Sequence, residues 1–420
     1  MTYQLHHIYD YNVLLVPVKD TNVIFVQSYI LSGRMNEGKK NSGISHLLEH
    51  VLTESWKKCK NDCAKYWGKK GIITNASTGD ATINYYIEGL VKNSEEIIEY
   101  IVKITTDPQI RDSRITVEKK AVYEELSREL NDSSWKISHK ITDYFYNLDG
   151  LKNGNNTKLQ IRNLKHITKK DLVNYCKKIY TPRNILFVVA GNFSKPKILT
   201  LFKQFLPKNT LMGAKNLKQN MLSKITKPKI CFIKEKNTKT AEVVFSFMSN
   251  IQPNDIETCY FSIISEILSG SMHSLFMRRL RSELHLIYNI NVYIEADITG
   301  TLTTIETTID PDKVEQLIKE VTDILRYVCE GNVNEDQLNR VKDVFLINED
   351  KKCKNTFFYG NYYADQFMSQ LYKRKPKILT YSDRVKIINK VTKDDIIKLC
   401  KKIFKMNECL IVYQASKKVH

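Results

Sequence analysis

The sequence predicts an α+β protein made of two similar halves, each opening with strands and continuing with helices. The length of 420 residues is long for one hydrophobic core and favours two domains of about 200 residues. A helical pattern at 167–180 recurs at 391–404. A hydrophobic content of 42% and a charged content of 26% are typical of globular proteins.

The repeat consists of ITKKDLVNYCKKIY at 167–180 and VTKDDIIKLCKKIF at 391–404. Both begin with Thr-Lys, follow a helical apolar pattern, carry a cysteine at the same position (Cys176 and Cys400), and precede a strand pattern at the same offset. Chance similarity of two lysine-rich helices does not readily explain the matched cysteines. The polar stretch after the first repeat marks the boundary. We expect an N-terminal domain at 1–208, a linker at 209–228 and a C-terminal domain at 229–420.

The first half is expected to begin with strands because its apolar residues are β-branched or aromatic and are bounded by turn residues. A helix is expected at 93–106 because Asp107-Pro108 stops it. We expect strands at 12–18, 22–31, 72–77 and 82–88, and helices at 44–52, 54–70, 93–106 and 115–130. In the second half we expect strands at 230–235, 242–248 and within 288–309, and helices at 255–268, 272–285 and across 311–404.

The motif His46-Leu-Leu-Glu49-His50 places three polar side chains on one face of the helix, at positions i, i+3 and i+4. Apolar residues within 44–52 form the opposite, buried stripe, and Ser42 is expected to cap the helix. Two imidazoles one turn apart can hold a zinc ion, and the carboxylate between them can accept a proton from water. The order is that of the inverted zinc-peptidase signature. The alternative is a solvent-facing helix that carries two histidines by chance.

A third metal ligand is expected from the helix at 115–130, since catalytic zinc takes three protein ligands and leaves one position for water. Glu118 and Glu125 lie seven residues apart on one face of that helix. Glu125 is the candidate ligand, and Glu118 is expected to support it from nearby. Glu124 is adjacent and spacing alone does not exclude it. An ordinary charged helix face is the competing interpretation.

The net charge of +19 comes mostly from lysines spread over the whole chain. There is no aromatic-plus-basic stacking motif and no arginine cluster, so a solvated lysine-rich surface is favoured over a nucleic-acid interface. No secretory signal pattern and no run of 18 apolar residues is present. We therefore expect a cytoplasmic protein without a membrane or specific nucleic-acid partner, although a viral or organellar setting fits as well.

The nine cysteines are odd in number and contain no C-x-x-C motif. This pattern predicts reduced thiols in a cytosol-like compartment. Cys59 and Cys63 lie four residues apart and could share a metal, but two separate thiols are favoured.

Several motifs, taken in order, resemble the pitrilysin-type (insulinase-like) M16 zinc metallopeptidases, and in length the short, processing-peptidase-like members of that family. The resemblance covers nearly the whole chain. The chain departs from the family at His285, which stands where the family usually has glycine in Gly-Leu-Ala-Tyr, and in the loop before Met272, which has fewer glycines than usual. The matching segments are Ser32–Arg34, Ser42–Ile44, His46–His50, Asn75–Thr78 with Thr82 and Tyr85–Tyr86, Glu118 through Glu125, and Leu280–Arg281 with Tyr288.

The resemblance implies a LuxS/MPP-like metallohydrolase fold. Each half would be a mainly antiparallel sheet backed by helices, and the halves would close as a clamshell around a chamber. It also implies one Zn2+ per chain, Glu49 as general base, and substrate binding by Asn75 and Ala76 in the first half and by Arg281 and Tyr288 in the second.

The expected function is that of a zinc-dependent metalloendopeptidase that hydrolyses extended or unfolded peptides. The partner would be a peptide or an unfolded protein segment, and a homodimer is also expected. Two alternatives remain: a catalytically inactive scaffold or partner subunit of the same fold, and a basic interaction protein that uses its lysine-rich surface.

Overall fold

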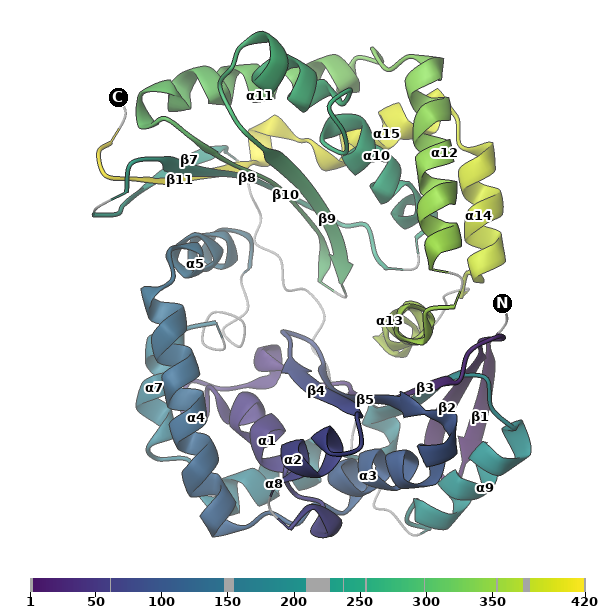
Figure 1. Ribbon diagram of the computed structural model, residues 1–420. Coiled ribbons are helices and arrows are strands. Elements are labelled where there is room, and N and C mark those ends of the chain that lie inside the picture. Colours follow the sequence, from purple (N-terminus) through teal and green to yellow (C-terminus); the bar gives the residue numbers. More distant parts are fainter. Residues whose placement is uncertain are drawn as a thin grey trace. The chain divides into compact units, whose positions relative to one another are not determined.

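The computed structural model forms two compact units (Figure 1). Unit 1 comprises Met1–Asn131, Leu148–Gln219 and Lys352–Thr380, and unit 2 comprises Asp132–Asn147, Asn220–Lys351 and Tyr381–His420. The structure describes residues 3–60, 62–146, 155–208, 227–236, 238–253, 255–297, 299–352, 354–372 and 378–418.

Unit 1 is organised around a six-stranded sheet with the order β1-β2-β6-β3-β5-β4. Neighbouring strands are antiparallel except β2 and β6, which run parallel. The predicted strands of the first half are confirmed. The strands are β1 (Gln4–Ile8), β2 (Tyr11–Pro17), β3 (Val23–Ile30), β4 (Ile73–Thr78), β5 (Ile83–Leu90) and β6 (Ile185–Gly191).

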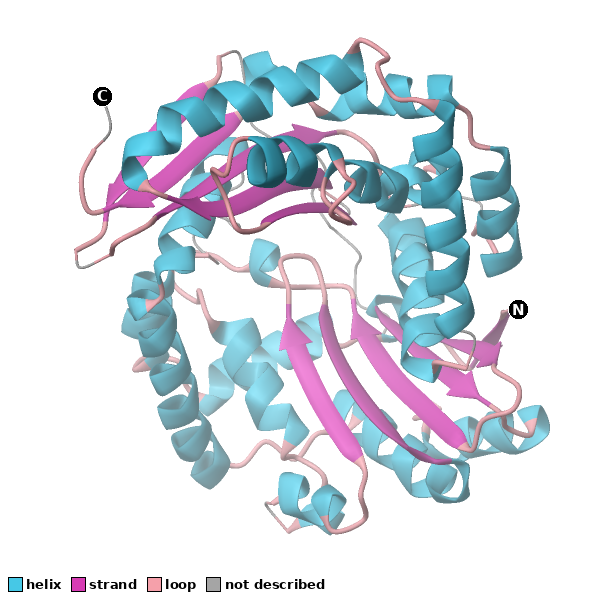
Figure 2. Cartoon of the chain, turned by 45° about the horizontal axis from the view of Figure 1, so that its top comes forward, coloured by secondary structure: helices cyan, strands magenta, loops and turns pink. Residues whose placement is uncertain are grey.

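Helices lie on both faces of this sheet (Figure 2, helices cyan and strands magenta). On β3, Ile24 and Val26 belong to the core that also contains α1 and α3. Phe25 and Tyr29 point to the other face, because side chains alternate along a strand, and there they meet α13. The helices of unit 1 are α1 (Ile44–Thr53), α2 (Cys63–Gly68), α3 (Ser94–Thr106), α4 (Asp112–Asn131), α7 (Thr157–Leu164), α8 (Lys169–Ile179), α9 (Lys195–Phe205) and α13 (Thr356–Tyr372).

Unit 2 has a five-stranded sheet with the order β7-β11-β8-β10-β9. Among its described strands, β7 and β11 run parallel and the other neighbours are antiparallel. Position for position this is the order β2-β6-β3-β5-β4 of unit 1, so the two sheets share one topology. The strands are β7 (Lys229–Lys234), β8 (Ala241–Ser249), β9 (Ile290–Asp297), β10 (Gly300–Ile309) and β11 (Leu410–Ala415), and the helices are α10 (Phe261–Leu268), α11 (Val314–Cys329), α12 (Glu335–Lys351), α14 (Tyr381–Lys390) and α15 (Lys393–Ile403).

The sequence repeat corresponds to α8 and α15, which precede β6 and β11, the more central strand of the parallel pair in each sheet. Thr168 caps α8 and Thr392 caps α15, each in a capping box with an aspartate three residues later. Cys176 and Cys400 are both buried at the matched position. The predicted two-half architecture, with mainly antiparallel sheets backed by helices, is confirmed.

Two helices pack on the sheet of the other sequence half. Helix α5 (Ser133–Phe145) precedes the predicted linker, yet it contacts β8 and β11 in unit 2. Helix α13 follows the linker, yet it contacts β2, β3 and β6 in unit 1. The compact units therefore differ from the ranges 1–208 and 229–420 by this reciprocal exchange of one helix.

The continuous helix expected at 54–70 is wrong. A 3-10 turn at Lys57–Cys59 is followed by Lys60 in the left-handed region (φ 51°), and α2 begins only at Cys63. Cys59 and Cys63 form a disulfide, so the prediction of reduced thiols is wrong for this pair. Cysteine content consequently no longer supports a reducing compartment. Among the described residues, no helix is long and apolar enough to cross a membrane.

Candidate metal centre

Helix α1 presents the motif because its apolar residues are anchored in the core of unit 1. Leu47, Leu48, Val51 and Leu52 are buried, which fixes the rotation of the helix about its axis. The opposite face carries the two histidines and the glutamate at the predicted spacing.

The start of α1 differs from the prediction that Ser42 is the N-cap. The N-cap residue is Gly43, which has a φ of 92° and provides no side-chain cap. The buried carboxylate of Glu37 instead accepts hydrogen bonds from the backbone N–H groups of Gly43 (2.7 Å) and Ser45 (2.9 Å). Sequence analysis missed this residue, because Glu37 lies well outside the N-cap position where capping residues are sought.

The structure brings together His46, His50 and Glu125, whose potential ligand atoms all lie within 4.8 Å of one another. Glu125 Oε2 is 3.5 Å from His46 Nε2 and 3.4 Å from His50 Nε2. Atoms bound at about 2.0–2.1 Å to a tetrahedral zinc ion are separated by about 3.4 Å. The donor set and its spacing therefore fit a zinc ion. Glu124, the alternative left open by spacing, is exposed and is not part of this cluster.

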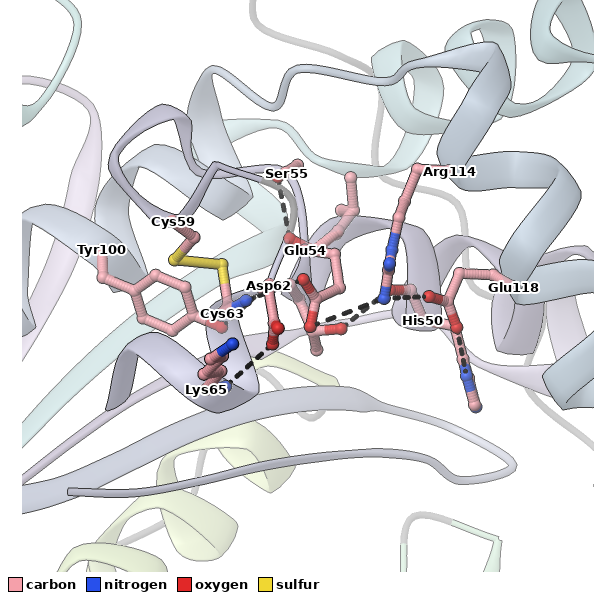
Figure 3. Close-up of polar contacts among 12 residues, drawn as sticks. His50, Glu54, Ser55, Cys59, Asp62, Cys63, Lys65, Tyr100, Arg114 and Glu118 are labelled. Carbon is pink, nitrogen blue, oxygen red and sulfur yellow. Dashed lines mark hydrogen bonds and ion pairs between the residues drawn. A yellow bond between two sulfur atoms is a disulfide. The ribbon is translucent and has the colours of Figure 1, made fainter. Parts of the chain in front are cut away.

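Glu118, which was expected only to lie near the metal site, contacts the imidazole of His50 (Figure 3). Its buried Oε2 is 3.1 Å from His50 Nδ1 and accepts a hydrogen bond from it, which leaves Nε2, the nitrogen that faces Glu125, as the one that would bind a metal. Glu118 and Glu125, seven residues apart on α4, thus contact the two nitrogens of the same imidazole: Glu118 contacts Nδ1 and Glu125 contacts Nε2.

Glu49 is held next to this cluster by the last residue of β4. Thr78 Oγ1 donates a 2.7 Å hydrogen bond to Glu49 Oε2. Burial raises the pKa of Glu49, although His46 and the Thr78 hydrogen bond partly oppose that effect. A raised pKa suits a general base that works near neutral pH. Sequence analysis placed Thr78 in a segment that matches the family, Asn75–Thr78, but gave this residue no role.

The electrostatics of the cluster favour a cation. Burial lowers the pKa of His50, but hydrogen bonds with Glu118 and Glu125 outweigh it and raise that pKa to about 10. Hydrogen bonds from His46 and His50 hold the pKa of Glu125 far below its usual range. Three carboxylates, those of Glu49, Glu118 and Glu125, thus surround the two histidines, and this negative charge favours a divalent cation.

The residues expected to bind substrate in the first half, Asn75 and Ala76, lie on β4. This strand is at the edge of the sheet, paired with β5 on one side. Asn75 is exposed and its Oδ1 accepts a hydrogen bond from the Ala76 N–H, whereas the Ala76 side chain packs against the core. The same strand ends at Thr78, so the edge leads to Glu49.

Arg281 and Tyr288 meet within unit 2. Arg281 lies in a π-helix at Met277–Glu283, and its guanidinium carbon is 4.5 Å from the centroid of the Tyr288 ring. Tyr288 is 78% exposed. His285, at the position where a glycine was expected, has a φ of 52°. The backbone therefore keeps a conformation that glycine would adopt without strain.

Known proteins share this chain's sequence pattern and fold. The family model described as "Insulinase (Peptidase family M16)" matches residues 15–154, and that described as "Peptidase M16 inactive domain" matches residues 166–345. A protein from Rickettsia felis named "Uncharacterized zinc protease" is 23% identical over 382 residues, covering 89% of this chain and 87% of that protein.

Two further matches agree. "Mitochondrial-processing peptidase subunit beta" from Homo sapiens is 26% identical over 180 residues, which are 42% of this chain and 36% of that subunit, so the match spans well under half of the relative. The crystal structure of a protease from Helicobacter pylori superposes with a TM-score of 0.85 at 18% identity, covering 98% of this chain and 99% of that one. The two family models account for most of the chain, and the chain belongs to peptidase family M16, the insulinase family.

Proposed function

We propose that this protein is a zinc-dependent metalloendopeptidase that hydrolyses extended or unfolded peptides. The observation that carries the proposal is the fit of His46, His50 and Glu125 to a tetrahedral zinc ion, with Glu49 buried beside them. The names of relatives in the family, which include zinc protease, support it.

His46 and His50 would bind one zinc ion per chain through Nε2, and Glu125 through its carboxylate. When bound, zinc supplies a Lewis acid for the scissile carbonyl and for the attacking water. Glu49 takes the proton from that water and passes it to the leaving amine. Since Thr78 occupies Oε2 of Glu49, we assign the proton transfer to Oε1. Glu118 keeps the Nδ1–H tautomer of His50 throughout.

The substrate would bind along the free edge of β4. An extended peptide can pair with the backbone of an edge strand, which reads shape more than sequence. Asn75 and Ala76 would lie along this peptide, and Thr78 at the end of the strand would direct it to Glu49. In unit 2, the half-buried Arg281 and the exposed Tyr288 supply donors that suit a peptide backbone.

The alternative is an inactive scaffold or partner subunit of the same fold. The family model described as an inactive domain matches residues 166–345, but the metal cluster lies at 46–125, inside the segment that the insulinase model matches. An inactive protein also has no need for a buried glutamate that is held next to the cluster. We therefore favour the enzyme.

The test is cleavage of a pool of unstructured peptides by the purified protein, read by mass spectrometry and accompanied by metal analysis. The wild type should contain one zinc per chain and cut the pool. Glu49→Gln should keep zinc and lose cleavage, and Glu125→Gln should lose both. Glu124→Gln is the matched control with the same change of charge, and it should keep both. Equal cleavage by Glu49→Gln, or loss of zinc only in Glu124→Gln, would refute the assignment.

A further inference from the structure

A chain of charged contacts continues beyond Glu118, and the proposed reaction does not require it (Figure 3). Arg114 lies one helical turn before Glu118 on α4, and its Nη2 is 2.6 Å from Glu118 Oε1. The two oxygens of Glu118 are therefore divided between His50 and Arg114. Arg114 is thus linked to His50 through the buried carboxylate of Glu118.

Arg114 is itself held from the end of the zinc helix. Glu54 is the C-cap residue of α1, and its Oε1 is 3.6 Å from Arg114 Nη2. The other oxygen of Glu54 accepts a 2.8 Å hydrogen bond from the Cys63 N–H, at the start of α2. The disulfide between Cys59 and Cys63 closes the loop that presents this N–H. Glu54 is buried, so it is a fixed anchor for the guanidinium.

The arrangement has a direct physical consequence for His50. A buried carboxylate that contacts one imidazole could rotate about its terminal torsion, and its charge would be incompletely paired. The guanidinium fixes Glu118 Oε1 by a charge-assisted hydrogen bond, which leaves Oε2 directed at His50 Nδ1. It also separates the negative charges of Glu54 and Glu118.

We propose that Arg114 is a positioning residue for the metal: it orients Glu118, and through Glu118 the ring of His50, while Glu54 holds Arg114 in place. The inference rests on the proposed function only in taking zinc as the ion. Arg114 contacts Glu118 and Glu54, neither of which is a proposed metal ligand, so its effect is expected on metal affinity and ligand geometry.

The experiment measures zinc affinity by competition with a chromophoric chelator and records the visible spectrum of the Co2+-substituted protein. Arg114→Gln should bind zinc about tenfold more weakly, the lower end of the effect of groups that support metal ligands. Its Co2+ bands should shift, because the imidazole of His50 is no longer held at one angle. Arg128→Gln is the matched control, since Arg128 is exposed on the same helix and the change of charge is identical. This control should match the wild type in both measurements.

Two milder variants make the test independent of whether Arg114→Gln folds. Arg114→Lys keeps the charge but not the planar fork, so it should recover part of the zinc affinity. Glu54→Gln keeps the accepting oxygen for Cys63 and removes the charge beside Arg114, so it should give a smaller loss than Arg114→Gln. A purely structural role would lower thermal stability and leave the Co2+ spectrum of the folded variants unchanged. Wild-type zinc affinity and Co2+ spectra in the Arg114 and Glu54 variants would overturn the inference.

Failure of this inference and failure of the proposed function are distinguishable. Variants that bind zinc like the wild type in a protein that cuts peptides refute the role of Arg114 alone. A wild type that binds zinc and cuts no peptide refutes the endopeptidase, and the comparison of zinc affinities still decides the role of Arg114.

Discussion

The buried carboxylate at the start of the zinc helix gives the sharpest prediction for stability. Replacing Glu37 by alanine removes the acceptor of two backbone N–H groups, those of Gly43 and Ser45. Neither group has an intrahelical partner, because Gly43 is the N-cap residue and Ser45 lies in the first turn of α1. Gly43 offers no side-chain cap in exchange.

The magnitude follows from the number of donors. Each buried N–H without a partner costs about 1–3 kcal/mol, so two cost about 4 kcal/mol. Removal of the buried carboxylate offsets part of this cost, since burial raises the pKa of Glu37 despite the two hydrogen bonds. We expect Glu37→Ala to lower the free energy of unfolding by about 3 kcal/mol. Glu37→Gln has one accepting oxygen in place of two and should lose about half as much.

The assay is urea denaturation of the metal-free protein, together with hydrogen exchange of the amides at the start of α1. The exchange of Gly43 and Ser45 should accelerate most, because these two amides lose their acceptor. Glu95→Gln is the matched control, since Glu95 is an exposed glutamate in the first turn of α3 in the same unit. Glu95→Gln should change the free energy of unfolding by no more than about 0.5 kcal/mol. A similarly small cost for Glu37→Ala, with unchanged amide protection, would refute the capping role.

Four further outcomes are expected. His285→Gly should raise the free energy of unfolding by up to about 1 kcal/mol in urea denaturation, because His285 has a φ of 52°, and an unchanged or lower value would contradict the strain. Replacing both Cys59 and Cys63 by serine should cost roughly 2 kcal/mol in the same assay, since the disulfide closes a loop with a sequence separation of 4, and no loss would contradict it. Iodoacetamide at pH 8 should label the half-buried Cys231 before Cys176, because burial raises the pKa of Cys176 to about 12. Peptide mapping by mass spectrometry would show the order of labelling, and early labelling of Cys176 would contradict its burial. Chelation should lower the melting temperature, because free zinc at a hundredfold excess over Kd adds about 2.7 kcal/mol to the free energy of unfolding. An unchanged melting temperature in calorimetry would contradict metal binding.

Much of the fold was predictable from sequence because the informative patterns are local. The spacing of His46, Glu49 and His50 fixes a shared helix face, and the apolar stripe opposite them fixes which face is buried. The repeat was equally clear, since Thr168 and Thr392 cap their helices in the same way. Helical spacing also indicated that Glu118 and Glu125 share one face of their helix, and in the structure both contact the imidazole of His50.

The features that could not be predicted depend on contacts between segments far apart in sequence. The contact between Glu54 and Arg114 joins the end of one helix to another helix much later in the chain, and no local periodicity indicates it. The hydrogen bond from Thr78 to Glu49 has the same character. The helix expected at 54–70 failed for a different reason: Lys60 adopts a left-handed backbone beside the disulfide, which helix propensity does not reveal.

The exchange of α5 and α13 between the sequence halves has a consequence for how the chain must fold during synthesis. Phe25 on β3 is fully buried and packs on Phe357 of α13, where Gly360 leaves room for its ring. A ribosome that has released only the first half therefore exposes an apolar sheet face whose cover has not yet been made. Completion of unit 1 waits for residues 352–380, so its folding has a high contact order and is expected to be slow. Fragments cut at the linker should accordingly aggregate alone and become soluble only when both are expressed together.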